Sequence, residues 1–224
     1  MRIFHVSDLH LDNAMSGGPF GWLGRFDVSA YAGGSDDTLV VAGDTAEQVD
    51  DAIDALNAAA RRFRSVVATW GNHEKGLPTH ARAPNLHVLD LQAQGLHIDP
   101  VTRVGYVGGC LTPADDGQFT RTEEGLRSLE AAAAVDRIVI VSHFVPTPRI
   151  GPLVGLDLRE KCNNLLERVP PKATKPTAVV FGHAHIEIDA TLDGVRLVSN
   201  PRGYRRQRRD QTLFRDFKEL AVVA

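Results

Sequence analysis

Residues that can bind metal ions follow five short apolar runs of this 224-residue chain. They are Asp8 with His10, Asp44 behind Gly43, Asn72, His73 and Glu74 behind Gly71, His143, and His183 with His185 behind Gly182. Carboxylate, amide and imidazole groups form mixed oxygen and nitrogen shells, which suit manganese, iron, zinc or nickel better than a metal that prefers thiolates. The two blocks that combine a glycine with histidine, Gly-Asn-His-Glu and Gly-His-Ala-His, are the most specific of the set.

This set contains more ligands than one ion can use. Two divalent ions roughly 3.5–4 Å apart that share one carboxylate would use them all and leave positions for water and substrate oxygens. Two such ions contribute about +4, Asp8 and Asp44 about −2 and a bridging hydroxide −1, which leaves a charge of about +1. A site of that charge is expected to attract a phosphate group.

Each block also has a structural interpretation. An aspartate behind a strand often begins a turn or caps the next helix, which is the alternative for Asp8 and Asp44. A lone histidine is more often a hydrogen-bonded structural residue than a ligand. The prediction therefore depends on whether the blocks converge in space. The histidines that do not follow strand ends are interpreted as structural or surface residues, and they are His5, His80, His87 and His97.

The elements that must position these residues are short buried strands separated by helical patterns, which predict an α/β sandwich. Strands are predicted at 3–6, 39–42, 66–69, 86–89, 104–108, 138–141 and 178–181, then a hairpin of 187–192 and 195–199 around Asp193-Gly194, and a last strand within 214–223. Helices are predicted at 49–62, at 122–134 with Thr122 as the N-cap, and at 156–168. Residues 13–37 and 144–155 are predicted to be loops. Because the carboxyl ends of parallel strands meet at one edge of a sheet, the polar blocks are expected to meet there.

Composition excludes several other classes of protein. The 25 basic and 28 acidic residues give a net charge of −3, which argues against a general polyanion-binding protein. With 43% hydrophobic and 24% charged residues, the chain is expected to form one packed domain over 1–224. It has no apolar run of the roughly 18 residues that span a membrane, and its first residues predict a strand, so a cytoplasmic location is expected. The two cysteines, Cys110 and Cys162, are expected to be buried apolar residues.

Taken in order, the blocks from Asp8 to His185 resemble the calcineurin-like metallophosphoesterase superfamily. The resemblance implies a four-layer α/β/β/α sandwich with two mixed β-sheets. It also implies a metal-dependent phosphoric ester hydrolase with two divalent ions, manganese first and iron, zinc or nickel as alternatives. One ion would be held by Asp8, His10, Asp44 and His185, and the other by Asp44, Asn72, His143 and His183.

The resemblance also implies a mechanism. A hydroxide that bridges the two ions would attack phosphorus in line, so Asp44, which binds both ions, is a catalytic candidate. His73 would contact the phosphate together with Asn72 and would protonate the leaving oxygen. Glu74 would orient His73 or would be an exposed acid of the loop.

Departures from related families indicate the substrate class. The Ser/Thr protein phosphatases of the superfamily carry Gly-Asp-x-Val-Asp-Arg-Gly, whereas Thr45-Ala46-Glu47-Gln48 follows Asp44 here. Lipid-pathway pyrophosphatases carry Asn-Arg in place of Asn72-His73. The remaining pattern resembles small bacterial phosphodiesterases, so we expect a phosphodiester of a nucleotide or nucleic acid. The alternatives are a phosphomonoesterase or protein phosphatase, and a catalytically silent interaction module on the same fold.

Two further segments are candidates for substrate contacts. Aromatic and basic residues at 20–26 could stack a nucleobase or fill the core, and they are Phe20, Trp22, Arg25 and Phe26. Five arginines within 202–209 create a basic segment that suits a polyanion, although a salt-bridged turn is the alternative. Asn200-Pro201 resembles a block that closes the site in this family, which brings Arg202 and Tyr204 near the substrate. The sequence indicates no membrane association and no protein partner.

Overall fold

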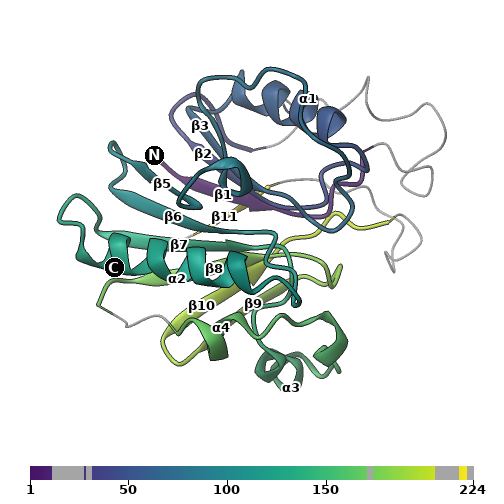
Figure 1. The fold of residues 1–224 in the computed structure, drawn as a ribbon, viewed down its shortest axis with the longest axis vertical. Helices are drawn as coiled ribbons and strands as arrows, with labels where there is room; N and C mark the ends of the chain where they lie inside the picture. The colour runs from purple at the N-terminus through teal and green to yellow at the C-terminus, as the bar shows by residue number, and fades with distance from the viewer. Residues whose placement is uncertain (12–27, 29–31, 171–173, 205–216, 221–224) are drawn as a thin grey trace.

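The chain folds into two β-sheets that pack face to face (Figure 1). The computed structural model describes residues 1–11, 28, 32–170, 174–204 and 217–220. The first sheet has the order β11-β1-β2-β3-β4, in which β1 to β4 are parallel and β11 is antiparallel to β1. Its strands are β1 (Ile3–Val6), β2 (Thr38–Ala42), β3 (Ser65–Thr69), β4 (Leu86–Val88) and β11 (Lys218–Glu219).

The second sheet has the order β5-β6-β7-β8-β10-β9. Its four central strands are parallel, and the edge strands β5 and β9 are antiparallel to their neighbours. The strands are β5 (Leu96–Asp99), β6 (Val104–Gly109), β7 (Arg137–Ser142), β8 (Thr177–Phe181), β9 (Ile188–Leu192) and β10 (Val195–Ser199). Both sheets are therefore mixed, as the family resemblance implied.

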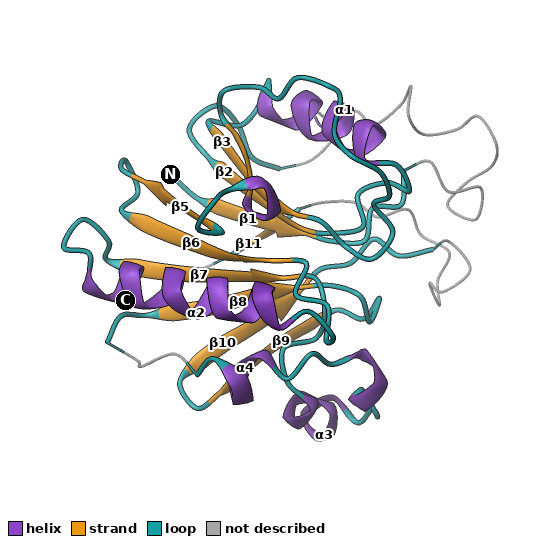
Figure 2. Cartoon of the chain, in the orientation of Figure 1, coloured by secondary structure: helices purple, strands orange, loops and turns teal. Residues whose placement is uncertain are grey.

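Three hydrophobic clusters divide the chain into four layers. In β2, Leu39 and Val41 pack toward α1 (Val49–Ala60), while Val40 and Ala42 pack between the two sheets. Strand β7 alternates in the same way between the inter-sheet core and α2 (Asp116–Ala131). The helices thus cover the outer faces of the two sheets (Figure 2). The predicted α/β/β/α sandwich is confirmed.

Most predicted strands are present, and the differences have local causes. Strand β5, an antiparallel edge strand of four residues, was not predicted. Helix α2 begins at Asp116 and not at Thr122, since the Asp115 carboxylate accepts the amide N–H of Gln118 at 3.2 Å and provides the N-cap. Among the described helices, none combines the length and the apolar character that a membrane span requires.

The predicted helix over 156–168 is wrong. This stretch contains only the 3₁₀ turn η5 (Arg159–Lys161) and the single-turn helix α4 (Leu165–Arg168). Between them the backbone at Cys162 pairs with Val145, and Asn164 adopts a left-handed conformation with φ of 57°. The preceding segment, predicted as a loop, forms the short helices η4 (Pro148–Ile150) and α3 (Gly151–Val154). Pairing with the loop that follows β7 overrode the helical pattern.

A buried ion pair joins the two sheets at the edge where β3 begins. The Asp99 side chain is 1% exposed, and the Arg64 guanidinium donates to both of its oxygens, with Nη1 at 3.0 Å from Oδ1. Burial opposes ionisation of Asp99, but the hydrogen bonds from Arg64 lower its pKa to about 2. Because this folded-state pKa lies below the value of an unfolded aspartate, the pair stabilises the fold above about pH 4 and the contribution is lost between about pH 4 and 2.

We expect Arg64→Met to lower the free energy of unfolding by about 2–3 kcal/mol at pH 7, because it leaves the Asp99 carboxylate buried without a partner. Urea unfolding at pH 7 and pH 3 measures this, and the difference from the wild type should shrink at pH 3. Arg103→Met removes an exposed pair with Asp136 and should cost less than about 1 kcal/mol. Equal effects of the two substitutions would contradict the assignment.

Candidate metal centre

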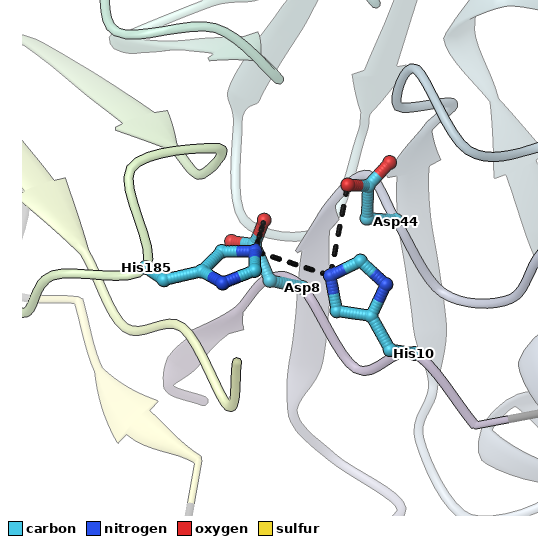
Figure 3. Close-up of side chains that lie close together, drawn as sticks. All are labelled: Asp8, His10, Asp44 and His185. Carbon is cyan, nitrogen blue, oxygen red and sulfur yellow. Dashed lines mark hydrogen bonds and ion pairs between the residues drawn. The ribbon is translucent and has the colours of Figure 1, made fainter. Parts of the chain in front are cut away.

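The predicted ligands converge where the carboxyl ends of strands from both sheets meet. Asp8 and His10 follow β1, and Asp44 follows β2; Asn72 and His73 follow β3. His143 follows β7, and His183 and His185 follow β8. Figure 3 shows Asp8, His10, Asp44 and His185 pointing toward one another. The convergence that the interpretation required is therefore present.

The backbone at this site is unusual. Asp8, His10, Asp44, His183 and His185 all have positive φ, between 44° and 66°. For a residue other than glycine, this left-handed conformation costs about 1–2 kcal/mol. Such strain concentrates at functional sites, where the surrounding structure holds it in place. The loops are thus shaped to direct these side chains to a common point.

Glycines allow the loops to approach one another closely. A Cβ atom at Gly71 would lie 2.0 Å from Oδ1 of Asp44, and one at Gly182 would lie 2.5 Å from Oδ2 of Asp8. No larger residue fits at either position without moving a carboxylate. The close approach of a carboxylate therefore explains why a glycine precedes each of these two ligand blocks.

The first group of ligands has the spacing of a metal site. The ligand atoms of Asp8, His10, Asp44 and His185 lie within 4.8 Å of one another. Nε2 of His185 is 3.1 Å from Nε2 of His10 and 3.2 Å from Oδ1 of Asp8. Two atoms that each lie about 2.1 Å from one ion are about 3.0–3.4 Å apart at octahedral or tetrahedral angles. The residues present therefore fit one divalent ion.

The second group is built around His143. Its Nε2 lies 3.3 Å from Oδ2 of Asp44 and 3.0 Å from Oδ1 of Asn72, and its ring centre is 5.2 Å from that of His183. Nδ1 of His143 donates to the carbonyl oxygen of Ala42 at 3.0 Å, which leaves the lone pair of Nε2 for a ligand. Oδ2 of Asp44 is also 3.7 Å from Nε2 of His10, so it lies beside both groups.

The electrostatics of the cluster favour a bound cation. Burial lowers the pKa of both His10 and His183 to about 4, so these imidazoles are neutral at pH 7 and can ligate a metal. Burial would also lower the pKa of His143, but the carboxylates of Asp44 and Asp8 raise it to about 9. Two buried carboxylates thus attract positive charge to this position, which a divalent metal ion would supply.

His73 lies at the open side of the cluster and has a carboxylate partner. Its Nδ1 is 2.8 Å from Oε1 of Glu47, and its backbone N–H donates to Oδ1 of Asp44 at 3.0 Å. The side chain of His73 is 29% exposed, and its Nε2 is 3.9 Å from Oδ2 of Asp44. Sequence reasoning missed Glu47. Glu47 lies three residues after Asp44, in the block that differs from that of the protein phosphatases. That difference was the only sequence signal for its role.

Glu74 has a different function from the one predicted. Its carboxylate accepts the backbone N–H groups of Asp44 at 3.2 Å, Thr45 at 2.5 Å and Gly71 at 2.7 Å. These bonds tie the loop after β2 to the loop after β3. Glu74 therefore fixes the backbone of the two loops, whereas Glu47 is the residue that orients the His73 ring.

The two predicted substrate contacts occupy different environments. Arg202 is 5% exposed, and its Nη1 donates to the carbonyl oxygen of Leu9 at 2.8 Å, so it supports the loop after β1. The ring of Tyr204 stacks on that of His10 at 4.4 Å, and its hydroxyl is 3.5 Å from Nε2 of His73. The aromatic segment 20–26 and the arginines of 205–209 lie outside the described residues.

We expect Glu47→Gln to lower kcat about 10- to 100-fold while the bound metal is retained, because the substitution weakens the hydrogen bond that orients His73. Steady-state kinetics together with elemental analysis of the purified protein measure both quantities. Glu124→Gln, a change on the exposed face of α2, serves as the control. Metal loss in Glu47→Gln would show instead that Glu47 belongs to the ligand set.

Comparison with known proteins agrees with the family resemblance of the sequence. Residues 1–187 match the family model of the calcineurin-like phosphoesterases. A search of curated proteins found no significant match. Among solved structures, a phosphopantetheinyl hydrolase from Mycobacterium tuberculosis aligns with a TM-score of 0.63 at 18% sequence identity, covering 98% of this chain and 95% of the other. The chain therefore belongs to the calcineurin-like phosphoesterase family and is a metal-dependent phosphoric ester hydrolase.

Proposed function

We propose that the protein hydrolyses a phosphodiester of a nucleotide or nucleic acid at a centre of two divalent ions, with manganese as the preferred metal. The observation that carries the proposal is the position of Asp44. Its Oδ2 lies 3.7 Å from Nε2 of His10 and 3.3 Å from Nε2 of His143, so one carboxylate oxygen serves two groups of ligands. One group is Asp8, His10 and His185, and the other is Asn72, His143 and His183.

When bound, the two ions would neutralise the charge of the phosphate and provide the nucleophile by lowering the pKa of water. The protein's own residues then have separate functions. His73 directs Nε2 toward the substrate and protonates the leaving oxygen, while Glu47 holds its Nδ1. Tyr204 places its hydroxyl beside the same nitrogen, where it can donate to a phosphate oxygen.

The open side of the centre favours a diester. Asn72 is exposed, and His73 and Tyr204 are partly exposed, so the cluster is open to solvent on this side. The described segment 144–159 forms only short helices and provides no cap domain. Such a site accommodates a phosphate with a large group on each side. The four arginines of 205–209 would add positive charge that favours a polyanion.

Hydrolysis of bis-p-nitrophenyl phosphate and of p-nitrophenyl phosphate, each with added Mn²⁺, tests the proposal. We expect the diester to react at least about tenfold faster, and we expect chelation to abolish both activities. A tenfold preference for the monoester would favour the phosphomonoesterase alternative. Metal binding without hydrolysis of either ester would favour an interaction module. A phosphopantetheinyl ester belongs in the same panel, because the structural neighbour is named for that activity.

A further inference from the structure

The carboxylate of Asp8 uses its two oxygens differently. Oδ1 lies 3.2 Å from Nε2 of His185, within the first group of ligands (Figure 3). Oδ2 accepts the hydroxyl of Ser7 at 2.5 Å. The backbone N–H of His183 donates to both oxygens, at 2.9 Å to Oδ1 and at 3.2 Å to Oδ2. One oxygen therefore faces the other ligands, whereas a side-chain hydroxyl occupies the second.

Asp44 shows the same division with a different donor. Its Oδ1 accepts the backbone N–H of His73 at 3.0 Å, and its Oδ2 lies beside both groups of ligands. In Asp44 the donor belongs to the backbone, which a substitution of the donor residue leaves in place. In Asp8 the closest donor is the hydroxyl of Ser7, which a substitution can remove while every ligand stays unchanged.

The position of Ser7 is fixed by the segment that follows β10. Ser7 is fully buried, its N–H donates to the carbonyl oxygen of Asn200 at 3.1 Å, and its carbonyl oxygen accepts the N–H of Arg202 at 2.9 Å. The loop after β8 lies directly against the hydroxyl, because a Cβ atom at Gly182 would be 2.9 Å from Oγ of Ser7. The hydroxyl is therefore held against Asp8 by two separate segments of the chain.

We propose that Ser7 is a positioning residue for the first metal ion and makes Asp8 a ligand through one oxygen. The hydroxyl holds Oδ2, so that only Oδ1 is free to bind an ion. Hydrogen-bonding partners of a ligand fix its orientation, and their loss typically costs about 10- to 100-fold in metal affinity. Without the hydroxyl, Oδ2 loses a donor in a buried place and the carboxylate is free to rotate. The inference rests on the proposed function, because it concerns one of the two proposed ions.

Titration of the metal-free protein with Mn²⁺ tests the inference without a substrate, with the electron paramagnetic resonance signal of free Mn²⁺ as the readout. We expect Ser7→Ala to weaken the binding of one ion at least about tenfold and that of the other less than about twofold. Ser199→Ala is the matched control and should leave both affinities unchanged. Ser199 is also buried at the end of a strand, but its hydroxyl has no hydrogen-bond partner among the described residues.

The same titration of the Asp8→Asn protein separates an effect through Asp8 from a general effect on the fold. If the hydroxyl acts through the carboxylate, Ser7→Ala should cause no further loss of affinity for the ion that this protein still binds, since the effects of coupled residues are not additive. Equal losses in the two backgrounds would overturn the inference. Unchanged affinities in Ser7→Ala, or an equal loss in Ser199→Ala, would overturn it as well.

The dependence of turnover on Mn²⁺ gives a second readout. The defect of Ser7→Ala should shrink as the concentration of Mn²⁺ rises, because the hydroxyl acts on metal affinity. A defect of the same size at every Mn²⁺ concentration would contradict the inference. If no phosphodiester is hydrolysed but Ser7→Ala still weakens the binding of one ion, the proposed function fails while the role of Ser7 stands.

Discussion

Replacement of Asp44 by asparagine should lower kcat at least about 1,000-fold and reduce the bound metal from about two ions to fewer than one. The carboxylate is buried, and its Oδ2 lies beside ligands of both groups, so its loss weakens both ion positions together. Oδ1 also accepts the backbone N–H of His73 at 3.0 Å, and an amide in this place changes the hydrogen bonding of that loop. Kinetics on the diester and elemental analysis of dialysed protein measure the two effects.

Asp136→Asn, an exposed change at the far end of the second sheet, is the matched control and should leave both quantities unchanged. Thermal unfolding of the two metal-free variants separates misfolding from metal loss. An Asp44→Asn protein that keeps two ions and loses less than about tenfold in kcat would contradict the position of Asp44 between the two ligand groups.

Replacement of His73 by glutamine should have the second-largest effect, a loss of about 100- to 1,000-fold in kcat with both ions retained. The His73 ring contacts Oε1 of Glu47 through Nδ1 at 2.8 Å, and its Nε2 lies 3.9 Å from Oδ2 of Asp44. A general acid matters most when the leaving group is a poor one. The loss should therefore be larger for an alkyl ester, whose leaving alkoxide needs a proton, than for a p-nitrophenyl ester, whose phenolate does not.

The dependence on the leaving group distinguishes a proton donor from a residue that only binds phosphate. An equal loss for alkyl and p-nitrophenyl esters would show that His73 contacts the phosphate without protonating the leaving oxygen. Loss of metal to the same extent as in Asp44→Asn would place His73 in the ligand set.

The convergence of the candidate ligands was predictable because each stands at the end of a short buried strand. Parallel strands bring their carboxyl ends to a common edge, so Asp8, Asp44 and His143 converge although they are far apart in the sequence. The apolar runs predicted an α/β sandwich, whereas the order of its four layers came from the family resemblance. Local sequence and general sheet geometry were sufficient for the convergence of the strand ends.

The partners of the side chains were not predictable in the same way. Glu47 and Glu74 are both acids of the loops near His73, and only packing decides that Glu47 contacts the imidazole while Glu74 binds backbone amides. The segment 156–168 has a helical pattern, but its residue Cys162 pairs with Val145 across the sequence. Long-range contacts of this kind carry no local signal, so sequence reasoning did not find Glu47 as the partner of His73 and predicted a helix that is not present.

Anomalous diffraction at the manganese edge, from crystals of the protein grown with Mn²⁺, tests the central claim most directly. We predict two peaks about 3.5–4 Å apart with Asp44 between them. The first should lie among Asp8, His10 and His185, and the second should lie among Asn72, His143 and His183. A single peak at saturating Mn²⁺, or two peaks that do not share Asp44, would contradict the account.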